Sequence, residues 1–292
     1  MFHVSVIIPV YNAEKFVEQA VRSALALEET GEVILVEDAS PDNALEICMR
    51  LEKENSKVKL YRHANGENRG AGASRNLGIS KATCDYISFL DADDYFLPNR
   101  FMKAKDVFIK HPDADFTFGA SQFEDDFFQK NNKIRTLSGE HRKRAVFYQL
   151  LEGRNGDFDT NTVTVKRSSL LKIDPFKEKL LLHQDTELWY RMAWYLNGYP
   201  ASINEPIAVV RRHGQNRITN RTVNSKLQMW EELKREFDPL PLSRQEKRLL
   251  NLHYNYYKKA INGNRLSNKL RMIKTILITK FLHQYSHQSK LI

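Results

Sequence analysis

Short apolar runs alternate with helical periodicity along the first half of the chain. The apolar runs have the length of strands and cover residues 4–10, 33–36, 58–61 and 85–90. Between them, apolar positions follow helical spacing, which predicts helices over residues 14–27, 43–54 and 73–80 and a loop over 66–72. Because strands that alternate with helices form βαβ units, the pattern predicts an α/β fold of nucleotide-binding type with a mainly parallel central sheet.

The second half of the chain continues this pattern less regularly. It predicts a helix over residues 98–111, a strand over 116–118, a loop or hairpin over 124–133 and a helix over 139–151. Residues 159–165 are strand-like, an amphipathic helix starts near residue 184 and ends near 198, and residues 203–212 form the last predicted strand. No apolar run approaches the ~18 residues that are needed to span a bilayer.

Three carboxylates follow one of the apolar runs within four positions: Asp91, Asp93 and Asp94. A continuously apolar run is typical of a parallel strand covered on both faces, and ligands bind beyond the carboxyl ends of such strands. Crowded carboxylate oxygens favour a divalent cation, Mg2+ or Mn2+, whose other ligands are substrate phosphate and water. The alternative is an acidic cap on a helix that starts at Pro98.

The ends of the first two predicted strands also carry groups that suit a nucleotide. Tyr11 offers an aromatic face to a base and Asn12 offers an amide, although the alternative for Asn12 is a cap on the next helix. The carboxylate of Asp38 is suited to accept a hydrogen bond from N3–H of uracil, a donor that cytosine lacks. The alternative for this position, a helix cap, fits Asp42 better than Asp38.

Residues 68–76 read Asn-Arg-Gly-Ala-Gly-Ala-Ser-Arg-Asn. Glycines let a backbone approach a ligand closely, and the guanidinium groups of Arg69 and Arg75 match the geometry of phosphate. The segment is not a Walker loop, because no Gly-Lys-Ser/Thr follows it.

Composition and charge divide the chain into two parts. The 292 residues are 41% hydrophobic, which is enough to bury a sizeable core, and the net charge is +9. Residues 218–292 hold 15 Lys and Arg against 5 Asp and Glu, so nearly all of the positive charge lies there. We therefore expect a domain over residues 1–217 and a basic α-helical extension over 218–292.

Cysteine usage and the N-terminus bear on the compartment. Cys48 and Cys84 are too few for a disulfide framework and indicate reduced thiols. The N-terminus has no basic stretch and no small-residue cleavage site, so we expect no export and a cytoplasmic protein.

The tail has an apolar face with basic flanks. The apolar residues at helical spacing are Leu270, Ile273, Ile276, Leu277 and Phe281, and the basic ones are Lys269, Arg271, Lys274 and Lys280. A basic amphipathic helix of this kind is expected to bind the anionic surface of a membrane, which would place the protein at the inner face of the plasma membrane. The alternative is an apolar face that packs on the first domain or on a second subunit, as in a homo-oligomer.

Six motifs, each weak singly, occur in order over about the first 217 residues. They are Val-Ile-Ile-Pro-Val-Tyr-Asn at 6–12, Val-Glu-Asp-Ala-Ser at 36–40, the Asn-Arg-Gly segment at 68–76, Leu-Asp-Ala-Asp-Asp at 90–94, Gln-Asp-Thr-Glu-Leu-Trp at 184–189 and Arg-Arg-His-Gly at 211–214. Together they resemble a family 2 glycosyltransferase of the GT-A fold. Two positions depart from the family pattern: Glu37 stands where Asp is frequent, and Gln184 stands where Glu is frequent.

The resemblance implies a role for each matched residue. The residues implied to bind the donor nucleotide are Pro9, Val10, Tyr11, Asn12, Asp38, Asn68, Gly70, Arg75, Asp91 and Ala92. Asp93 is implied to hold the divalent cation, and His213 adds a metal or diphosphate contact, which favours Mn2+ over Mg2+. Asp185 is implied to be the general base of an inverting transfer, and the alternative for it is an acid in the first turn of a helix.

The resemblance also implies substrates. It implies that a hexose or an N-acetylhexosamine moves from a nucleotide-sugar donor, with UDP-sugar favoured, to a glycan or a polyprenyl-linked saccharide in bacterial cell-surface polysaccharide synthesis. The choice of sugar and linkage is expected to depend on residues 122–182. Two other classes of protein are alternatives. A sugar nucleotidyltransferase fits less well, because no Gly-rich loop with Arg and Lys follows the first strand. A basic nucleic-acid-binding protein would explain the charge of the tail, but no signature of a nucleic-acid-binding module is present.

Overall fold

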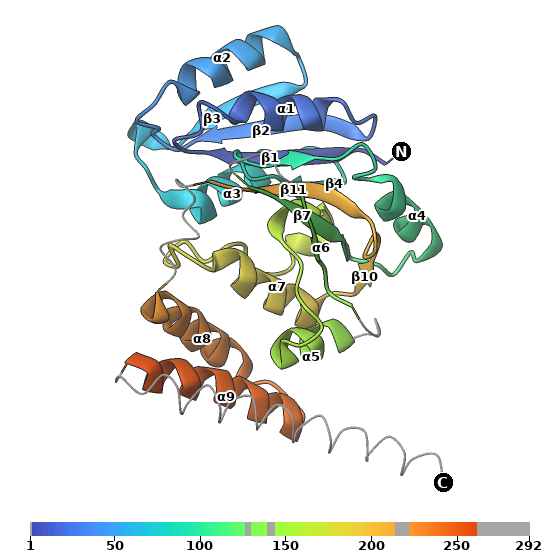
Figure 1. Ribbon diagram of the computed structural model, residues 1–292, viewed down its shortest axis with the longest axis vertical. Coiled ribbons are helices and arrows are strands. Elements are labelled where there is room, and N and C mark those ends of the chain that lie inside the picture. Colours follow the sequence, from blue (N-terminus) through green and yellow to red (C-terminus); the bar gives the residue numbers. More distant parts are fainter. Residues whose placement is uncertain (1, 126–129, 139–143, 214–221, 262–292) are drawn as a thin grey trace.

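The computed structural model describes residues 2–125, 130–138, 144–213 and 222–261. Its centre is a seven-stranded sheet in the order β10-β6-β9-β4-β1-β2-β3 (Figure 1). The strands of this sheet are β1 (Val4–Val10), β2 (Thr30–Glu37), β3 (Val58–Arg62), β4 (Tyr86–Phe89), β6 (Phe116–Phe118), β9 (Thr164–Lys166) and β10 (Gly198–Pro200). β1 pairs in parallel with β2 and β4, and β2 pairs in parallel with β3. Only β9 is antiparallel to its neighbours, so the mainly parallel sheet predicted from the sequence is confirmed.

Helices cover both faces of this sheet because β1 is buried on both sides. Successive side chains of a strand point to opposite faces. Val6 and Ile8 belong to a core with α1 (Val17–Leu25) and α2 (Ala44–Glu54), whereas Ile7 belongs to a second core with α3 (Gly70–Lys81) and α7 (Gln184–Tyr195). Figure 1 shows α1 and α2 above the sheet and α3 and α7 below it.

A second, four-stranded sheet has the order β5-β11-β7-β8. Its strands are β5 (Tyr95–Phe96), β7 (Ala120–Asp125), β8 (Lys130–Arg135) and β11 (Pro206–Arg212). β7 and β8 pair antiparallel, so the predicted loop or hairpin is a hairpin, and its turn lies outside the described residues. β5 follows the carboxylates directly and pairs with β11. This pairing brings the end of the last strand, and His213 after it, next to the carboxylates.

Several predicted boundaries differ from the structure. The predicted loop over 66–72 ends in helix, because α3 begins at Gly70 after the short 3-10 helix η1 (Ala64–Gly66). α4 covers Met102–Lys110, which starts four residues later than predicted, and α5 covers Ala145–Glu152. The segment predicted as strand-like over 159–165 is the 3-10 turn η2 (Thr160–Thr162), followed by β9 and the short helix α6 (Arg167–Leu170). Asp159 accepts a hydrogen bond from the Asn161 backbone N–H, which starts this turn instead of a strand.

The two C-terminal helices pack on the α/β core. α8 covers Val223–Phe237 and α9 covers Arg244–Ile261. Trp230 and Phe237 of α8 and Leu250 of α9 belong to the same buried cluster as Phe147 of α5 and Trp194 of α7. The helical extension predicted from the sequence is confirmed over these two helices. The proposed membrane-binding residues from Lys269 to Phe281, and the expected domain boundary at residues 217 and 218, lie outside the described residues.

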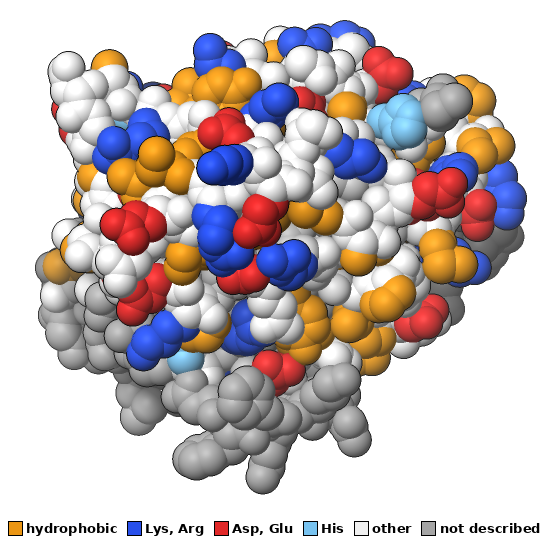
Figure 2. Space-filling model, turned by 90° about the horizontal axis from the view of Figure 1, so that it is seen from above, with side chains coloured by type: hydrophobic (Ala, Val, Ile, Leu, Met, Phe, Trp, Pro, Cys, Tyr) orange, Lys and Arg blue, Asp and Glu red, His pale blue; other side chains and the backbone are white. Residues whose placement is uncertain are grey.

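The face formed by α1 and α2 carries both signs of charge. Figure 2 views the molecule from this side, and basic and acidic side chains are interspersed on it. Arg22 and Arg50 form ion pairs with Glu18 and Glu54, both within each helix and between the two helices. The nucleic-acid-binding alternative rests on the positive charge of residues 218–292, part of which lies outside the described residues, so the face of α1 and α2 does not test it. In the described part of the chain, no helix is both long enough and apolar enough to cross a membrane.

Gly78 sets the distance between α3 and the sheet. A Cβ atom at this position would collide with the Ile7 side chain of β1. The helix therefore lies against the strand at a separation that only glycine allows.

Candidate active site

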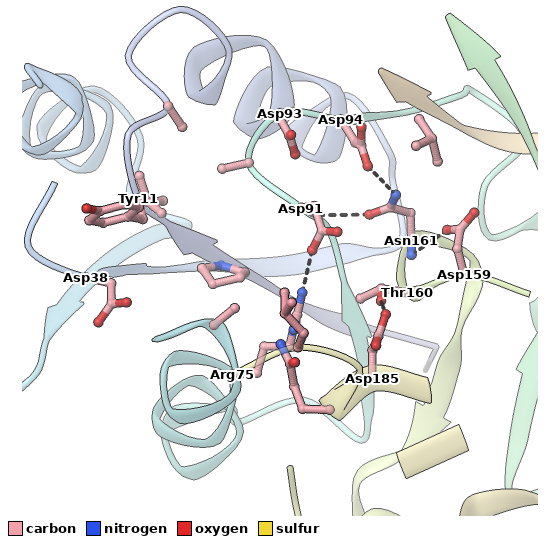
Figure 3. Close-up of a pocket in the computed structure, with 18 of the residues that line it drawn as sticks. Tyr11, Asp38, Arg75, Asp91, Asp93, Asp94, Asp159, Thr160, Asn161 and Asp185 are labelled. Atoms are coloured by element: carbon pink, nitrogen blue, oxygen red, sulfur yellow. Dashed lines mark hydrogen bonds and ion pairs between the residues drawn. The ribbon is translucent and has the colours of Figure 1, made fainter. Parts of the chain in front are cut away.

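A cavity of about 370 Å³ opens at the carboxyl ends of β1 and β4, where open α/β sheets bind ligands. Most of the residues that the sequence singled out line it: Pro9, Val10, Tyr11, Asn12, Asp38, Arg75, Asp91, Ala92, Asp93, Asp185 and His213. Figure 3 shows Tyr11 and Asp38 toward one end of the cavity, Asp185 and Thr160 toward the other, and Asp91 between them. Asn68 and Gly70 do not line this cavity but a second one beside it. The fold thus gathers residues that are spread over some 200 positions.

The three carboxylates have three different environments. Asp91 accepts a hydrogen bond from Arg75 Nη2 at 2.6 Å. Asp94 is buried and accepts from Asn161 Nδ2 at 2.7 Å and from the Arg211 backbone N–H at 2.8 Å. Asp93 Oδ2 lies 3.2 Å from His213 Nε2. The alternative of an acidic helix cap is wrong, because α4 starts only at Met102 and β5 intervenes.

Crowding changes the acidity of two of these carboxyl groups. Loss of hydration raises the pKa of Asp91, and the Arg75 guanidinium opposes that rise. Burial raises the pKa of Asp94 well above its ordinary value, and the charges of Asp93 and Asp91 add to the rise. Negative charge in this turn is therefore costly in the absence of a cation.

Asp93 and His213 fit a divalent cation that is shared with a substrate. Both side chains are partly exposed at the cavity, 30% for Asp93 and 15% for His213. Stacking on Phe16, with ring centroids 4.6 Å apart, fixes the orientation of the His213 imidazole. Among the described residues, no group of three or more His, Cys, Asp or Glu is arranged to hold a metal. One carboxylate and one imidazole suit a cation whose remaining ligands are diphosphate and water.

The end of the cavity near Tyr11 has the features expected for a base. Tyr11 is 40% exposed. Asn12 and Ala39 both have left-handed backbone conformations, with φ of 53° and 59°. Such strain persists in non-glycine residues where the surroundings enforce it, and it is frequent at functional sites. Asn12 is not a helix cap, because α1 starts at Val17.

Asp38 is buried, and its carboxylate has structural partners. Its two oxygens accept hydrogen bonds from the backbone N–H groups of Arg69 and Gly70, at 2.7 and 2.8 Å. Asp38 therefore fixes the start of α3, whereas the alternative from the sequence was a cap on the following helix, α2. Asn68 donates to the Asp38 backbone carbonyl at 2.7 Å. Asn68 and Gly70 thus support Asp38 in this structure, and their predicted contact with the nucleotide stays a prediction. Asp42 is the residue that accepts from Ala44 N–H, at the start of α2.

Asp185 lies in the first turn of α7 and lines the cavity. Its Oδ1 accepts from the Thr186 backbone N–H at 2.7 Å, and its Oδ2 accepts from Thr160 Oγ1 at 3.4 Å. His183, the residue before the first residue of α7, has a left-handed conformation with φ of 65°. A carboxylate in a first turn is stabilised by the helix dipole, which favours its charged form. This position suits a general base, and it equally suits the alternative, an acid that only stabilises the first turn of α7.

Asn161, which was not predicted from the sequence, joins the two halves of the site. Its Oδ1 accepts from the Asp91 backbone N–H at 2.8 Å and its Nδ2 donates to Asp94. Its own carbonyl accepts from Arg100 Nε at 2.8 Å, and Arg100 also donates to the Val163 carbonyl and to Ser88 Oγ. Burial lowers the pKa of Arg100 to about 9, so it remains a cation at neutral pH. The Asp-Thr-Asn-Thr run at 159–162 is a turn signal that was available in the sequence.

Comparison with known proteins gives the site a context. The sequence profile of the family described as "Glycosyl transferase family 2" matches residues 5–173. An uncharacterized glycosyltransferase of Haemophilus influenzae is 33% identical over 168 residues, which are 57% of this chain and 63% of that protein. The uncharacterized glycosyltransferase EpsJ of Bacillus subtilis is 38% identical over 197 residues, which are 60% of this chain and 56% of that protein. The matches thus span less than two thirds of the length of either relative.

Solved structures show the same architecture. S. aureus TarS 1-349 in complex with UDP-GlcNAc matches with a TM-score of 0.65 at 17% identity, over 93% of this chain and 79% of that chain. The mannosyltransferase PcManGT from Pyrobaculum calidifontis, in complex with GDP-Man and Mn2+, matches with a TM-score of 0.59 at 17% identity, over 99% and 81%. At such identity the likeness concerns the fold, and it confirms the predicted GT-A type. The family profile ends before Asp185 and His213, so it does not test the roles that the resemblance implies for them.

Proposed function

Because the chain belongs to glycosyl transferase family 2, we propose that it is a metal-dependent inverting enzyme that moves a sugar from a nucleoside-diphosphate donor to an acceptor hydroxyl. The observation that carries this proposal is that the Asp93–His213 pair and the Asp185 carboxylate line one cavity. Such a cavity suits a diphosphate at one place and a reacting hydroxyl at another. A UDP-sugar is the favoured donor, because Tyr11 and Asp38 lie at the opposite end of the cavity from Asp185 and suit a uracil base.

On this proposal, each part of the cavity has one task. Tyr11 packs on the uracil, and the Asp38 carboxylate accepts from its N3–H. Arg75 holds Asp91, which lies beside the ribose. Asp93 and His213 would hold Mn2+ or Mg2+, which when bound neutralises the negative charge that develops on the departing diphosphate.

Asp185 takes the acceptor proton. The acceptor hydroxyl attacks the anomeric carbon from the face opposite the leaving diphosphate, and its proton passes to an Asp185 oxygen as the new bond forms. One displacement inverts the anomeric configuration. Thr186 N–H and Thr160 Oγ1 hydrogen-bond to the two carboxylate oxygens, which keeps the carboxylate fixed for this transfer.

A screen of nucleotide sugars tests the proposal. Purified protein is incubated with UDP-, GDP- and dTDP-sugars, with and without Mn2+, and release of the nucleoside diphosphate is measured. We expect release from a UDP-sugar that depends on the cation. Release from none of these donors would contradict the proposal.

The same samples distinguish a nucleotidyltransferase. That enzyme would need added pyrophosphate and would form UTP, whereas a glycosyltransferase releases UDP without pyrophosphate. Membership of glycosyl transferase family 2 favours release of UDP without pyrophosphate.

The acceptor belongs to the proposal as well. We expect a glycan or polyprenyl-linked saccharide of the bacterial cell surface, presented at the cytoplasmic face of the membrane. Transfer of radiolabelled sugar to lipid extracts, compared with free oligosaccharides, separates these two kinds of acceptor.

A further inference from the structure

Residues 177–183, here called the wall segment, precede Gln184 and Asp185 at one side of the cavity. Leu181, Leu182 and His183 line the cavity. Leu181 is 74% exposed, whereas Leu180 is buried. Besides the buried Leu180, polar contacts at its two sides hold the segment.

One side of the wall segment is attached to α3. Glu178 pairs with Arg69 at 3.0 Å and accepts from Asn76 Nδ2 at 3.2 Å. Asn76 also exchanges two hydrogen bonds with the backbone of Phe176, at 2.9 Å each. These contacts lie within the part of the chain that makes up the nucleotide-binding fold.

The other side is attached to α8, which lies beside α7 (Figure 1). Glu232 of α8 is 7% exposed, and its carboxylate lies 2.7 Å from Lys179 Nζ and 3.9 Å from Lys177 Nζ. Lys177 also lies 3.4 Å from Glu236 of α8 and 3.0 Å from the buried Glu187 of α7. Glu232 also pairs with Arg235 at 2.6 Å. The carboxylate is largely buried while Lys179 is 57% exposed, so this ion pair is stronger than one between two exposed groups and weaker than a fully buried one.

A further contact from α8 reaches His183, the last residue of the wall segment. Ser225 Oγ lies 3.2 Å from Nε2 of His183, the left-handed residue from which α7 starts. A strained backbone persists only when its surroundings hold it. Ser225 also closes the capping box of α8 with Thr222, so its hydroxyl has a fixed position.

We propose that Glu232 and Ser225 of α8 are positioning residues: they hold the wall segment, and through it the Asp185 carboxylate, in the geometry that transfer requires. This inference rests on the proposed function and extends it to helices that lie beyond the family match at residues 5–173. A displacement of about 1 Å at a reacting group is enough to slow a reaction by about 100-fold. Contacts from α8 that fix the wall segment can therefore control turnover, although they do not touch the reacting groups.

Two pairs of variants test the proposal in the full chain. Glu232→Gln removes the charge that holds Lys179, and Glu231→Gln makes the same change at the adjacent, exposed position of α8. Ser225→Ala removes the contact with His183, and Thr222→Ala weakens the same capping box from a residue with no such contact. Melting temperatures check that all four proteins are folded.

Hydrogen exchange of residues 177–183 is measured first, because it needs no substrate. We expect exchange roughly 3- to 10-fold faster in Glu232→Gln, because the exposure of Lys179 weakens a charged hydrogen bond, and a wild-type rate in Glu231→Gln. The same contrast is expected between Ser225→Ala and Thr222→Ala. Equal exchange within either pair would overturn the proposal.

Turnover and binding are measured next, with the nucleotide sugar that the wild-type protein uses in the donor screen. We expect kcat to fall about 10-fold in Glu232→Gln while the Kd for UDP with Mn2+ stays within about two-fold of wild type. Faster exchange with unchanged kcat would show that α8 holds the wall segment without effect on catalysis, and would also overturn the proposal. A wild-type protein that uses no donor contradicts the proposed function, whereas the exchange comparison still decides whether α8 holds the wall segment.

Discussion

The Asp93 carboxylate and the His213 imidazole face each other across 3.2 Å, although 120 positions separate them in the sequence. Their meeting depends on β5 and β11, which pair directly after the carboxylates and directly before His213. Two unlike ligand groups from two segments therefore lie within reach of one cation.

Asp93→Asn is expected to abolish cation-dependent binding of UDP. A neutral amide replaces the anionic oxygen that attracts the cation, while the size of the side chain is kept. Calorimetry with UDP and Mn2+ measures the change, and His213→Ala is expected to lose less affinity because imidazole is the weaker ligand for a hard cation. Cation-dependent affinity that equals the wild-type value in Asp93→Asn would remove this residue from the metal site.

Asp185→Asn is expected to lower transfer by roughly 10²–10⁴-fold and to leave UDP binding with Mn2+ nearly intact, because the amide cannot accept the acceptor proton. If Asp185 only starts α7, the same change costs at most about 1 kcal/mol of stability and leaves turnover alone. Turnover and melting temperature on one sample separate the two roles.

Loss of stability with retained turnover in Asp185→Asn would send the search for a base to another acid. Asp159 lines the cavity, whereas Asp157 holds Arg135 and Glu187 is fully buried against Arg191. Asp159 would then be the first residue to replace.

Asp38→Asn is expected to weaken both the fold and UDP binding. The amide keeps one acceptor for the N–H groups of Arg69 and Gly70 and turns a donor toward the other, which costs about 1–3 kcal/mol. Asp42→Asn is the matched control, because Asp42 also accepts from backbone N–H groups but does not line the cavity. Chemical denaturation should show a loss in both variants, and UDP affinity should fall only in Asp38→Asn. Equal UDP affinity in the two variants would assign Asp38 to structure alone.

His253 makes stability depend on pH. Its ring stacks on Trp230 with centroids 4.4 Å apart, and its Nε2 lies 2.7 Å from the Leu151 carbonyl oxygen, so Nε2 donates. Burial lowers the pKa of His253 below its ordinary value. As the pH falls below about 6.5, His253 is protonated in the unfolded chain but stays neutral in the folded chain. The free energy of unfolding therefore falls until the pH reaches the lowered pKa of His253 in the folded chain.

His253→Gln should remove this part of the pH dependence. The slope that it removes is at most about 1.4 kcal/mol per pH unit, and none of it lies above about pH 6.5. Urea denaturation between about pH 7 and pH 5 measures it, with His111→Gln at an exposed site as the control. An unchanged slope in His253→Gln would contradict the prediction.

The basic tail is expected to bind anionic membranes. Each Lys or Arg near an anionic surface contributes about 1 kcal/mol, and the sequence after residue 261 has no acid to oppose this. Because α9 packs on α8, a chain that ends at Ile261 is the proper comparison, since it keeps both helices. Flotation with phosphatidylserine vesicles should recover the full chain and not the shorter one. Equal recovery would support the alternative, a tail that packs on protein.

The sequence predicted the strand ends well because their signal is local. Two short stretches each predict the end of a strand within a few positions: the apolar run before Asp91 and Pro-Val-Tyr-Asn at residues 9–12. The positions of Asp93 and Asp185 in one cavity followed from the fold and the resemblance together.

What the sequence did not predict depends on contacts between distant segments. Nothing near Asn161 indicates that its amide reaches the carboxylate turn, 67 positions away from Asp94. The hydrogen bond from Asn68 to the Asp38 carbonyl, 30 positions away, was not predicted for the same reason. Likewise, charge counting marked off residues 218–292 but did not reveal that Glu232 reaches the wall segment. Pairings of this kind are fixed by tertiary packing, which local patterns do not record.

The glycine at position 78 determines how far Arg75 reaches. The two residues are three apart on α3, on the side of the helix that faces the sheet, and Arg75 is almost fully buried where it meets Asp91. Any larger residue at 78 would lift the helix off β1 and draw the guanidinium away from the carboxylate. A residue that does not line the cavity is thus expected to set its width through Arg75, which does line it.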